Sequence, residues 1–108
     1  MADDALLRPP THPGVILRED VLPAMGVTQQ QLADALRLSR QTVNAILAAK
    51  SPVTAETAVK LGALLGNSPQ FWMNLQSAYD LWLARKQMDV EVLQELGNLH
   101  RWYAGDPL

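Results

Sequence analysis

The sequence predicts an all-α protein of five helices, with a possible short sixth helix near the C-terminus. Apolar residues recur at spacings of three and four, and no run alternates at the period of two that marks a half-buried strand. Ser, Thr or Asp at helix starts, and Gly or Pro at helix ends, divide the chain into short segments. A length of 108 residues, 48% of them hydrophobic, suits a single domain with a substantial core.

The stretch "HPGVILREDVLPAMG" predicts the first helix. Pro13 suits the first helical turn, where its missing N–H has no partner to lose, and His12 is expected to help start the helix. Pro23 and Gly26 are expected to close it. Residues 1–11, which precede this helix, are expected to form a flexible arm.

Two very short helices are expected next, at about residues 28–36 and 39–49. Thr28 and Gln31 have the spacing of a capping box, in which each side chain satisfies a free backbone N–H. Ser39 is the expected N-cap of the second helix. Because only two or three residues join them, the pair has the connection of a helix-turn-helix.

Two longer helices and a short one are expected after this pair. Thr54 precedes "AETAVKLGALLG", which should end at Gly66, and Ser68 precedes "PQFWMNLQSAYDLWLARK". Asp89 is the expected cap of "VEVLQEL". This sixth helix is expected to stop at Gly97, with irregular chain beyond it.

Some apolar residues fall outside the expected packing surfaces and are candidates for contact with another subunit or partner. In the fifth helix most apolar side chains share one stripe that should face the core, whereas Met73 and Leu81 fall off it. The C-terminal extension, residues 87–108, is apolar for a tail and includes Val90 and Leu93. It could fold back on the core, join a dimer or receive another protein.

The third helix has the composition expected of a segment that enters the major groove of DNA. The chain has a net charge of −2, yet residues 35–55 contain no acidic residue. One side of the helix is apolar and must pack on a core, and the other presents Arg40, Gln41 and Asn44 among alanines. Arg matches the acceptor edge of guanine, and Gln or Asn matches adenine, so these three are the candidates for base contacts.

Residues around that helix are candidates for contacts with DNA phosphates. They are Gln29, Arg37, Ser39 and Lys50. Short amphipathic helix pairs occur in many all-α proteins, and exposed Arg, Gln and Asn are usually ordinary solvated surface. The absence of carboxylates favours DNA binding, because phosphates repel them.

The stretch "VTQQQLADALRLSRQTVNAILAAK" resembles the helix-turn-helix of phage-repressor-type (XRE-like) regulators. The ordered set of "HPGVILREDVLPAMGVTQQQLADAL" and "VTAETAVKLGALLGNSPQFWMNLQSAYDL" resembles more narrowly the HigA family of bacterial antitoxins, over about residues 12–86. The resemblance implies a cytoplasmic, five-helix homodimer that binds palindromic double-stranded operator DNA and represses its own operon. It also implies neutralisation of a HigB-like toxin, an endoribonuclease acting on ribosome-bound mRNA.

The sequence departs from the family's pattern in two places. The family usually has Gly in the turn between the second and third helices, where this sequence has Arg37, and Asn-Gly before Lys50, where it has Ala48 and Ala49. A left-handed backbone would cost Arg about 1 kcal/mol, so a slightly altered turn is expected. Without the Asn-Gly pair, the third helix is expected to run a little longer.

The sequence gives no indication of an enzyme, a cofactor or a metal site. It has no cysteine, its two histidines are isolated, and no Gly-rich phosphate loop or Ser-His-Asp arrangement is present. No stretch approaches the roughly 18 apolar residues that span a bilayer, and the N-terminus is unlike a signal peptide. Two alternatives to an antitoxin stay open: a solitary helix-turn-helix transcriptional regulator without a toxin partner, and a protein-only inhibitor whose helix-turn-helix is vestigial.

Overall fold

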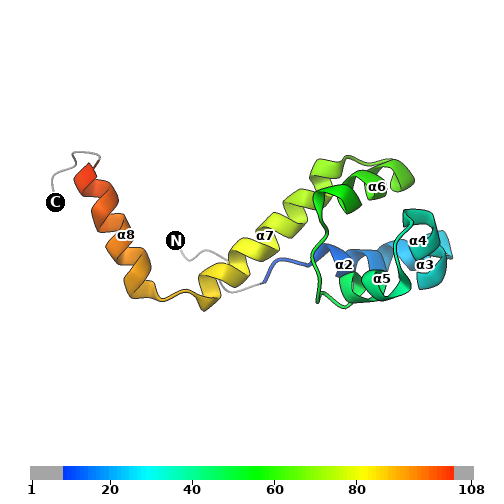
Figure 1. Ribbon diagram of the computed structural model, residues 1–108, viewed down its shortest axis with the longest axis horizontal. Helices are drawn as coiled ribbons and strands as arrows, with labels where there is room; N and C mark the ends of the chain where they lie inside the picture. The colour runs from blue at the N-terminus through cyan, green and yellow to red at the C-terminus, as the bar shows by residue number, and fades with distance from the viewer. Residues whose placement is uncertain (1–8, 104–108) are drawn as a thin grey trace.

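A computed structural model describes residues 9–103 (Figure 1). Over that range it contains no strand and six helices, the first of which consists of three consecutive segments. The elements are α2 (Pro13–Ile16), η1 (Leu17–Val21), α3 (Leu22–Met25), α4 (Gln29–Leu36), α5 (Arg40–Leu47), α6 (Ala55–Leu65), α7 (Pro69–Gln87) and α8 (Val90–Tyr103). The all-α expectation is confirmed. Most of the N-terminal arm expected for residues 1–11 lies outside the described residues. Among those described, no helix has the length and apolarity needed to cross a membrane.

The segments α2, η1 and α3 form one continuous first helix. His12 is its N-cap, as expected, and its Nδ1 atom accepts a hydrogen bond from the Gly14 N–H at 2.9 Å. Pro23 does not close the helix, which corrects the sequence prediction. The turn before it widens to the π-helical η1, which accommodates a residue with no N–H to donate, and the helix ends at the left-handed Gly26.

Local capping sets the boundaries of α4 and the start of α5. The Thr28 Oγ1 atom accepts from the Gln31 N–H at 3.1 Å, and the Gln31 Oε1 atom accepts from the Thr28 N–H at 2.8 Å. Ser39 caps α5 by accepting from the Thr42 N–H at 3.0 Å. The predicted capping box and N-cap are therefore confirmed, and they leave only a short turn between the two helices.

Capping residues also begin the three C-terminal helices, and the last of these helices is longer than the sequence predicted. Thr54 and Ser68 cap α6 and α7 as expected, and Gly66 ends α6 in the left-handed conformation. The Asp89 carboxylate accepts from the Glu91 N–H at the start of α8. However, α8 does not stop at Gly97. It continues to Tyr103, because one glycine costs an exposed helix only about 1 kcal/mol and the apolar spacing persists beyond it.

The core lies between the first helix, α4, α5, α6 and the N-terminal half of α7. Its buried apolar residues are Leu17, Leu22, Leu32, Ala33, Leu36, Val43, Ile46, Leu47, Val53, Ala58, Leu61 and Trp72. Met73 packs partly against this core, although the sequence placed it outside the packed stripe of its helix. In contrast, Phe71 lies on the stripe of apolar side chains that was expected to face the core, and it is exposed.

A buried amide side chain that the sequence did not reveal joins α7 to the loop after α5. The Gln76 Oε1 atom accepts a hydrogen bond from the Val53 N–H at 2.7 Å, and its Nε2 atom donates to the Asp80 carboxylate at 2.9 Å. Because both ends of the amide are satisfied, its burial is not penalised. The chain leaving α5 is thus fixed to α7.

The molecule is elongated because α8 lies apart from the other helices. Figure 1 shows α7 leading away from the packed helices and α8 beyond its far end. The principal extents are 58 × 25 × 24 Å and the radius of gyration is 18.2 Å. A compact chain of this length would have a radius of gyration of about 13 Å.

Candidate nucleic-acid interface

One side of α5 is buried and the other is exposed, as the sequence predicted. Val43, Ile46 and Leu47 are buried in the core. The candidates for base contacts, Arg40, Gln41 and Asn44, are all exposed on the outward side. Arg40 begins the helix, and Gln41 and Asn44 are its second and fifth residues, so the three side chains lie in or just after the first turn of α5. A recognition helix contacts bases with this part.

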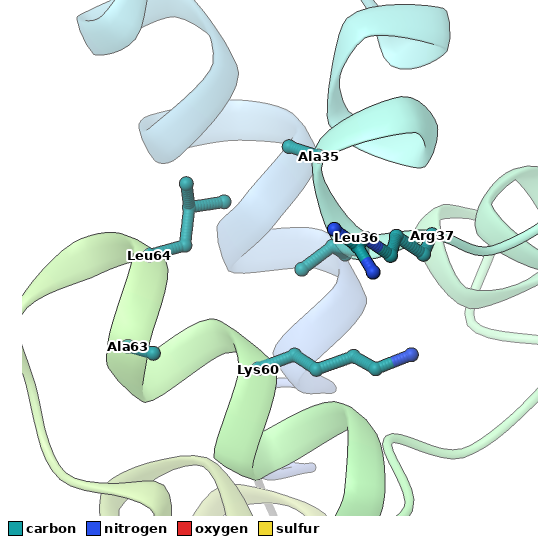
Figure 2. A pocket seen from close by; sticks show the side chains of 6 residues that line it. All are labelled: Ala35, Leu36, Arg37, Lys60, Ala63 and Leu64. Carbon is teal, nitrogen blue, oxygen red and sulfur yellow. The ribbon is translucent and has the colours of Figure 1, made fainter.

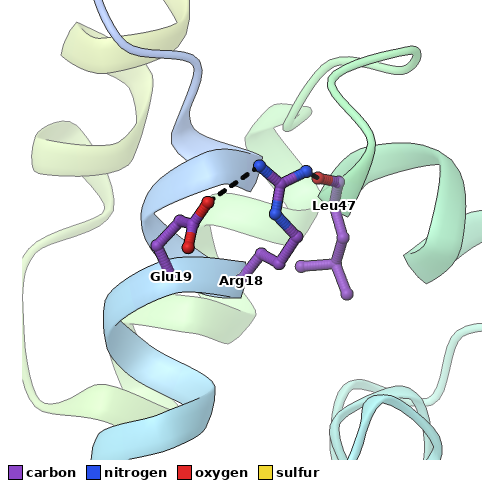
Figure 3. Close-up of polar contacts among 3 residues, drawn as sticks. All are labelled: Arg18, Glu19 and Leu47. Atoms are coloured by element: carbon purple, nitrogen blue, oxygen red, sulfur yellow. Dashed lines mark hydrogen bonds and ion pairs between the residues drawn. The ribbon is translucent and has the colours of Figure 1, made fainter.

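The first helix holds α5 in place through direct backbone packing and one charged side chain. At Gly14 an added Cβ atom would collide with the Ile46 carbonyl oxygen, so the two backbones approach closely. Figure 3 shows Arg18, whose Nη1 atom donates to the Leu47 carbonyl oxygen at 3.1 Å and whose Nη2 atom donates to Glu19 at 3.1 Å. The last carbonyl of α5 is therefore satisfied by a side chain that is itself paired.

Arg37 occupies the turn between α4 and α5 with a left-handed backbone, at φ 56°. Its N–H donates to the Asp34 carbonyl at 3.2 Å, and the Leu38 N–H donates to the Ala33 carbonyl at 3.0 Å. These two bonds form the helix-ending motif that usually contains glycine. The expectation of an altered turn is therefore wrong, because Arg37 adopts the glycine conformation.

Ala49 repeats this arrangement at the end of α5, with φ 60°. Its N–H donates to the Ile46 carbonyl at 3.0 Å, and the Lys50 N–H donates to the Ala45 carbonyl at 2.9 Å. Helix α5 consequently ends at Leu47, and the expectation of a longer helix is wrong. Hydrogen bonding at the helix end outweighs the backbone preference of alanine.

The four candidates for phosphate contacts are all exposed and surround α5. Gln29 begins α4, Ser39 precedes α5, and Arg37 and Lys50 lie just beyond the ends of α4 and α5. The Ser39 hydroxyl is also 2.8 Å from the Thr42 hydroxyl. Thr42 is exposed beside the candidates and was missed by the sequence analysis. The signal available in the sequence was that Thr42 lies three residues after the expected N-cap, Ser39.

Lys60 is a second cation near Arg37, and it too was not identified from the sequence. Figure 2 shows an open hollow lined by Ala35, Leu36, Arg37, Lys60, Ala63 and Leu64. Lys60 comes from α6, and its Nζ atom is 3.8 Å from a Glu56 carboxylate oxygen. Because that pair is largely solvated it contributes little to stability. At the edge of the hollow, Lys60 is therefore partly balanced by Glu56, and Arg37 forms no ion pair with the residues that the structure describes.

His12 lies under the loop that follows α5 and is buried. Its ring contacts Tyr79 edge to face, with 4.9 Å between centroids. Burial lowers the pKa of His12 below its ordinary value of 6.5, while the Asp80 charge and a hydrogen bond to the Ser51 backbone act in the opposite direction. The neutral ring is the form that accepts from Gly14, so it suits the N-cap position.

The candidates for contact with another subunit or partner differ in exposure. Met73 is half-buried against the core. Leu81, Val90 and Leu93 are exposed, at 54%, 64% and 43%. The last two lie on α8, away from α5 (Figure 1).

Comparison with known proteins adds one family match and several relatives. The helix-turn-helix family matches residues 17–72. Antitoxin HigA-1 of Vibrio cholerae is 40% identical over 84 residues, which cover 78% of this chain and 79% of the relative. The structure of Pseudomonas aeruginosa antitoxin HigA with the higBA promoter has 44% identity and a TM-score of 0.67, and covers 69% of this chain and 82% of that one. Antitoxin GraA in complex with its operator has 42% identity and a TM-score of 0.73, with coverages of 81% and 87%.

Proposed function

The chain belongs to the HigA family of helix-turn-helix antitoxins of type II toxin–antitoxin modules, and on that premise we propose how it acts. It binds operator DNA through α5, represses its own operon and neutralises a HigB-like toxin. Arg40, Gln41 and Asn44 contact bases, whereas Gln29, Arg37, Ser39 and Lys50 contact phosphates. The relatives solved with operator or promoter DNA support this use of the helix-turn-helix.

One observation supports the DNA-binding part most strongly. The outward side of α5 presents three side chains with base-matching hydrogen-bonding groups, and no acidic residue occurs from 35 to 55. The opposite side is fixed to the core, and the end of the helix is fixed by Arg18. A rigid helix with an uninterrupted cationic and amide surface is suited to a groove lined by phosphates.

The proposed assembly on DNA is a homodimer on a palindromic site. A single helix of eight residues makes few base contacts, so its affinity alone is low. Two copies that place α5 in successive major grooves, about 34–36 Å apart, are the common solution. The exposed Leu81 and the apolar residues of α8 provide surface for such an association, on elements other than α4 and α5.

Co-expression with the protein encoded by the neighbouring gene tests the antitoxin role. We expect that the neighbour alone arrests growth and that this chain restores it. An electrophoretic shift assay on the DNA upstream of the two genes tests repression separately. Operator binding without rescue would indicate a solitary regulator, and rescue without operator binding would indicate a protein-only inhibitor.

A further inference from the structure

The loop that joins α5 to α6, residues 48–54, carries one of the candidates for phosphate contacts. Lys50 is exposed in this loop, directly after the left-handed Ala49. A loop that moves relative to the helices loses freedom when one of its side chains binds, and this loss lowers affinity. The contribution of Lys50 to DNA binding therefore depends on how firmly the loop is held.

The loop backbone is held by hydrogen bonds on both sides of the Lys50 side chain. On the α5 side, two backbone N–H groups donate to carbonyls of the last turns of α5. On the α6 side, the Val53 N–H donates to the Gln76 Oε1 atom at 2.7 Å, and the buried His12 forms a hydrogen bond with the Ser51 backbone. Both of these side chains belong to elements that are distant in sequence from the loop.

Gln76 is well suited to fix the loop because its own amide is fixed. Its side chain is 3% exposed, and its Nε2 atom donates to the Asp80 carboxylate at 2.9 Å, so the amide cannot turn without losing a bond. Packing does not replace these bonds, because a hollow of about 220 Å³ lies between the loop and α7, with Lys50, Gln76 and Asp80 in its lining. Without the Gln76 acceptor, the buried Val53 N–H would have to move toward water to find a partner.

We propose that Gln76 is a positioning residue for DNA binding, which holds the loop through the Val53 N–H so that Lys50 is placed to contact a phosphate. This inference rests on the proposed function for the role of Lys50, and it extends the determinants of DNA affinity to a buried residue of α7. Because the loop is ordered before DNA binds, less freedom is lost in the complex. A phosphate contact carries no sequence information, so Gln76 should affect affinity for all DNA and leave base preference unchanged.

A double-mutant cycle on DNA affinity tests whether Gln76 acts through Lys50. Gln76→Met keeps a side chain of similar length and the same net charge but removes the acceptor. It should weaken binding to operator and scrambled DNA alike by about three- to ten-fold, and reduce the slope of log K against log salt by up to about one. In the Lys50→Ala background, the same substitution should weaken binding by less than about two-fold, because the contact it positions is already gone.

Gln29 provides the matched control, because it is a candidate phosphate contact on α4 and not on the loop. In the Gln29→Ala background, Gln76→Met should keep its full effect. Equal effects of Gln76→Met in the Lys50→Ala and Gln29→Ala backgrounds would indicate a general structural role and would overturn the proposal, as would natural DNA affinity of Gln76→Met itself. If Lys50→Ala alone left DNA affinity and its salt slope unchanged, the phosphate contact assigned to Lys50 would be wrong, and this separate result would identify a failure of the proposed function.

Amide hydrogen exchange in the natural chain tests the hold on the loop without any variant at position 76, so it applies even where Gln76→Met does not fold. The Val53 N–H lies outside the helices, yet it should exchange at least about 100-fold more slowly than in an unfolded chain. Exchange of the Val53 N–H at close to the unfolded rate would overturn the proposal, because Gln76 would not be holding the loop.

Discussion

Two residues of the helix-turn-helix hold backbone angles that glycine adopts at lower cost. Arg37 and Ala49 both have φ near 60° and both end a helix. Gly26 and Gly66 have the same role at the ends of α3 and α6. A left-handed backbone costs an L-residue about 1–2 kcal/mol, so the two non-glycine positions store strain beside the candidate interface.

Replacing these residues by glycine should stabilise the protein. We expect Ala49→Gly to raise the free energy of unfolding by up to about 1 kcal/mol, because the relieved strain exceeds the added entropy of the unfolded chain. Urea denaturation measures the change. The reverse substitution, Gly26→Ala, introduces no steric contact and should destabilise by a similar amount. If Ala49→Gly were destabilising, φ at this position would not be a source of strain.

The stability of the fold should depend on pH through His12. Burial lowers its pKa in the folded state, so near and below pH 6.5 the unfolded chain binds more protons than the folded one. Its contribution is complete above pH 6.5 and is lost as pH falls through the folded pKa. Denaturation at pH 7.5 and 5.5 should show lower stability at pH 5.5. His12→Asn keeps an N-cap acceptor without a titrating ring, and in that variant this difference should shrink. An equal difference in both proteins would contradict the assignment.

At the scale of elements, substitutions at two glycines distinguish the effect of packing on stability from the effect of helix propensity. Gly14→Ala places a methyl group against the Ile46 carbonyl and should destabilise by about 3 kcal/mol or more, as well as displace α5 from its position for DNA. Gly97→Ala meets nothing within 4 Å and should instead increase the helicity of α8. Circular dichroism and thermal unfolding compare the two variants. A tolerated Gly14→Ala would mean that the first helix does not fix α5.

Helix boundaries were predictable where a nearby side chain determines them. Thr28, Ser39, Thr54 and Ser68 each cap a helix within three residues, so a local pattern was sufficient. The division of α5 into a buried and an exposed side followed from its periodicity in the same way.

The features that the sequence analysis missed depend on the three-dimensional environment. The π-helical turn η1 allows Pro23 to lie inside the first helix, and the exposed helix α8 continues through Gly97. The buried Gln76 required knowledge of Val53, which is 23 residues away. The left-handed Arg37 was misjudged because a turn set by backbone hydrogen bonds outweighs the preference of one residue.

At the scale of the whole molecule, the proposed DNA-binding surface and the proposed association surface are on different elements. Truncation after Lys86 removes α8, which is apart from α5 and the core (Figure 1). We expect the truncated chain to lose dimer affinity or toxin neutralisation while it keeps its preference among DNA sequences. Sedimentation, growth rescue and competition binding with scrambled DNA measure the three properties. A truncated chain with a normal dimer and full neutralisation would mean that α8 has neither role.

The central claim is that α5 is the base-reading helix of an operator-binding dimer. It is tested most directly by a salt titration of operator and scrambled DNA for three variants. Asn44→Ala and Gln41→Ala should each lose about 1–3 kcal/mol on the operator only, with relaxed preference at one base position per half-site. Lys50→Ala should weaken both DNAs about equally and reduce the slope of log K against log salt by roughly one for each phosphate that is no longer neutralised.

All three residues are exposed, so each variant should fold and neutralise toxin as the natural chain does. The predicted result is therefore a separation of the variants into loss of sequence preference and loss of salt dependence. Unchanged operator preference in both Asn44→Ala and Gln41→Ala would contradict the assignment of α5 as the recognition helix.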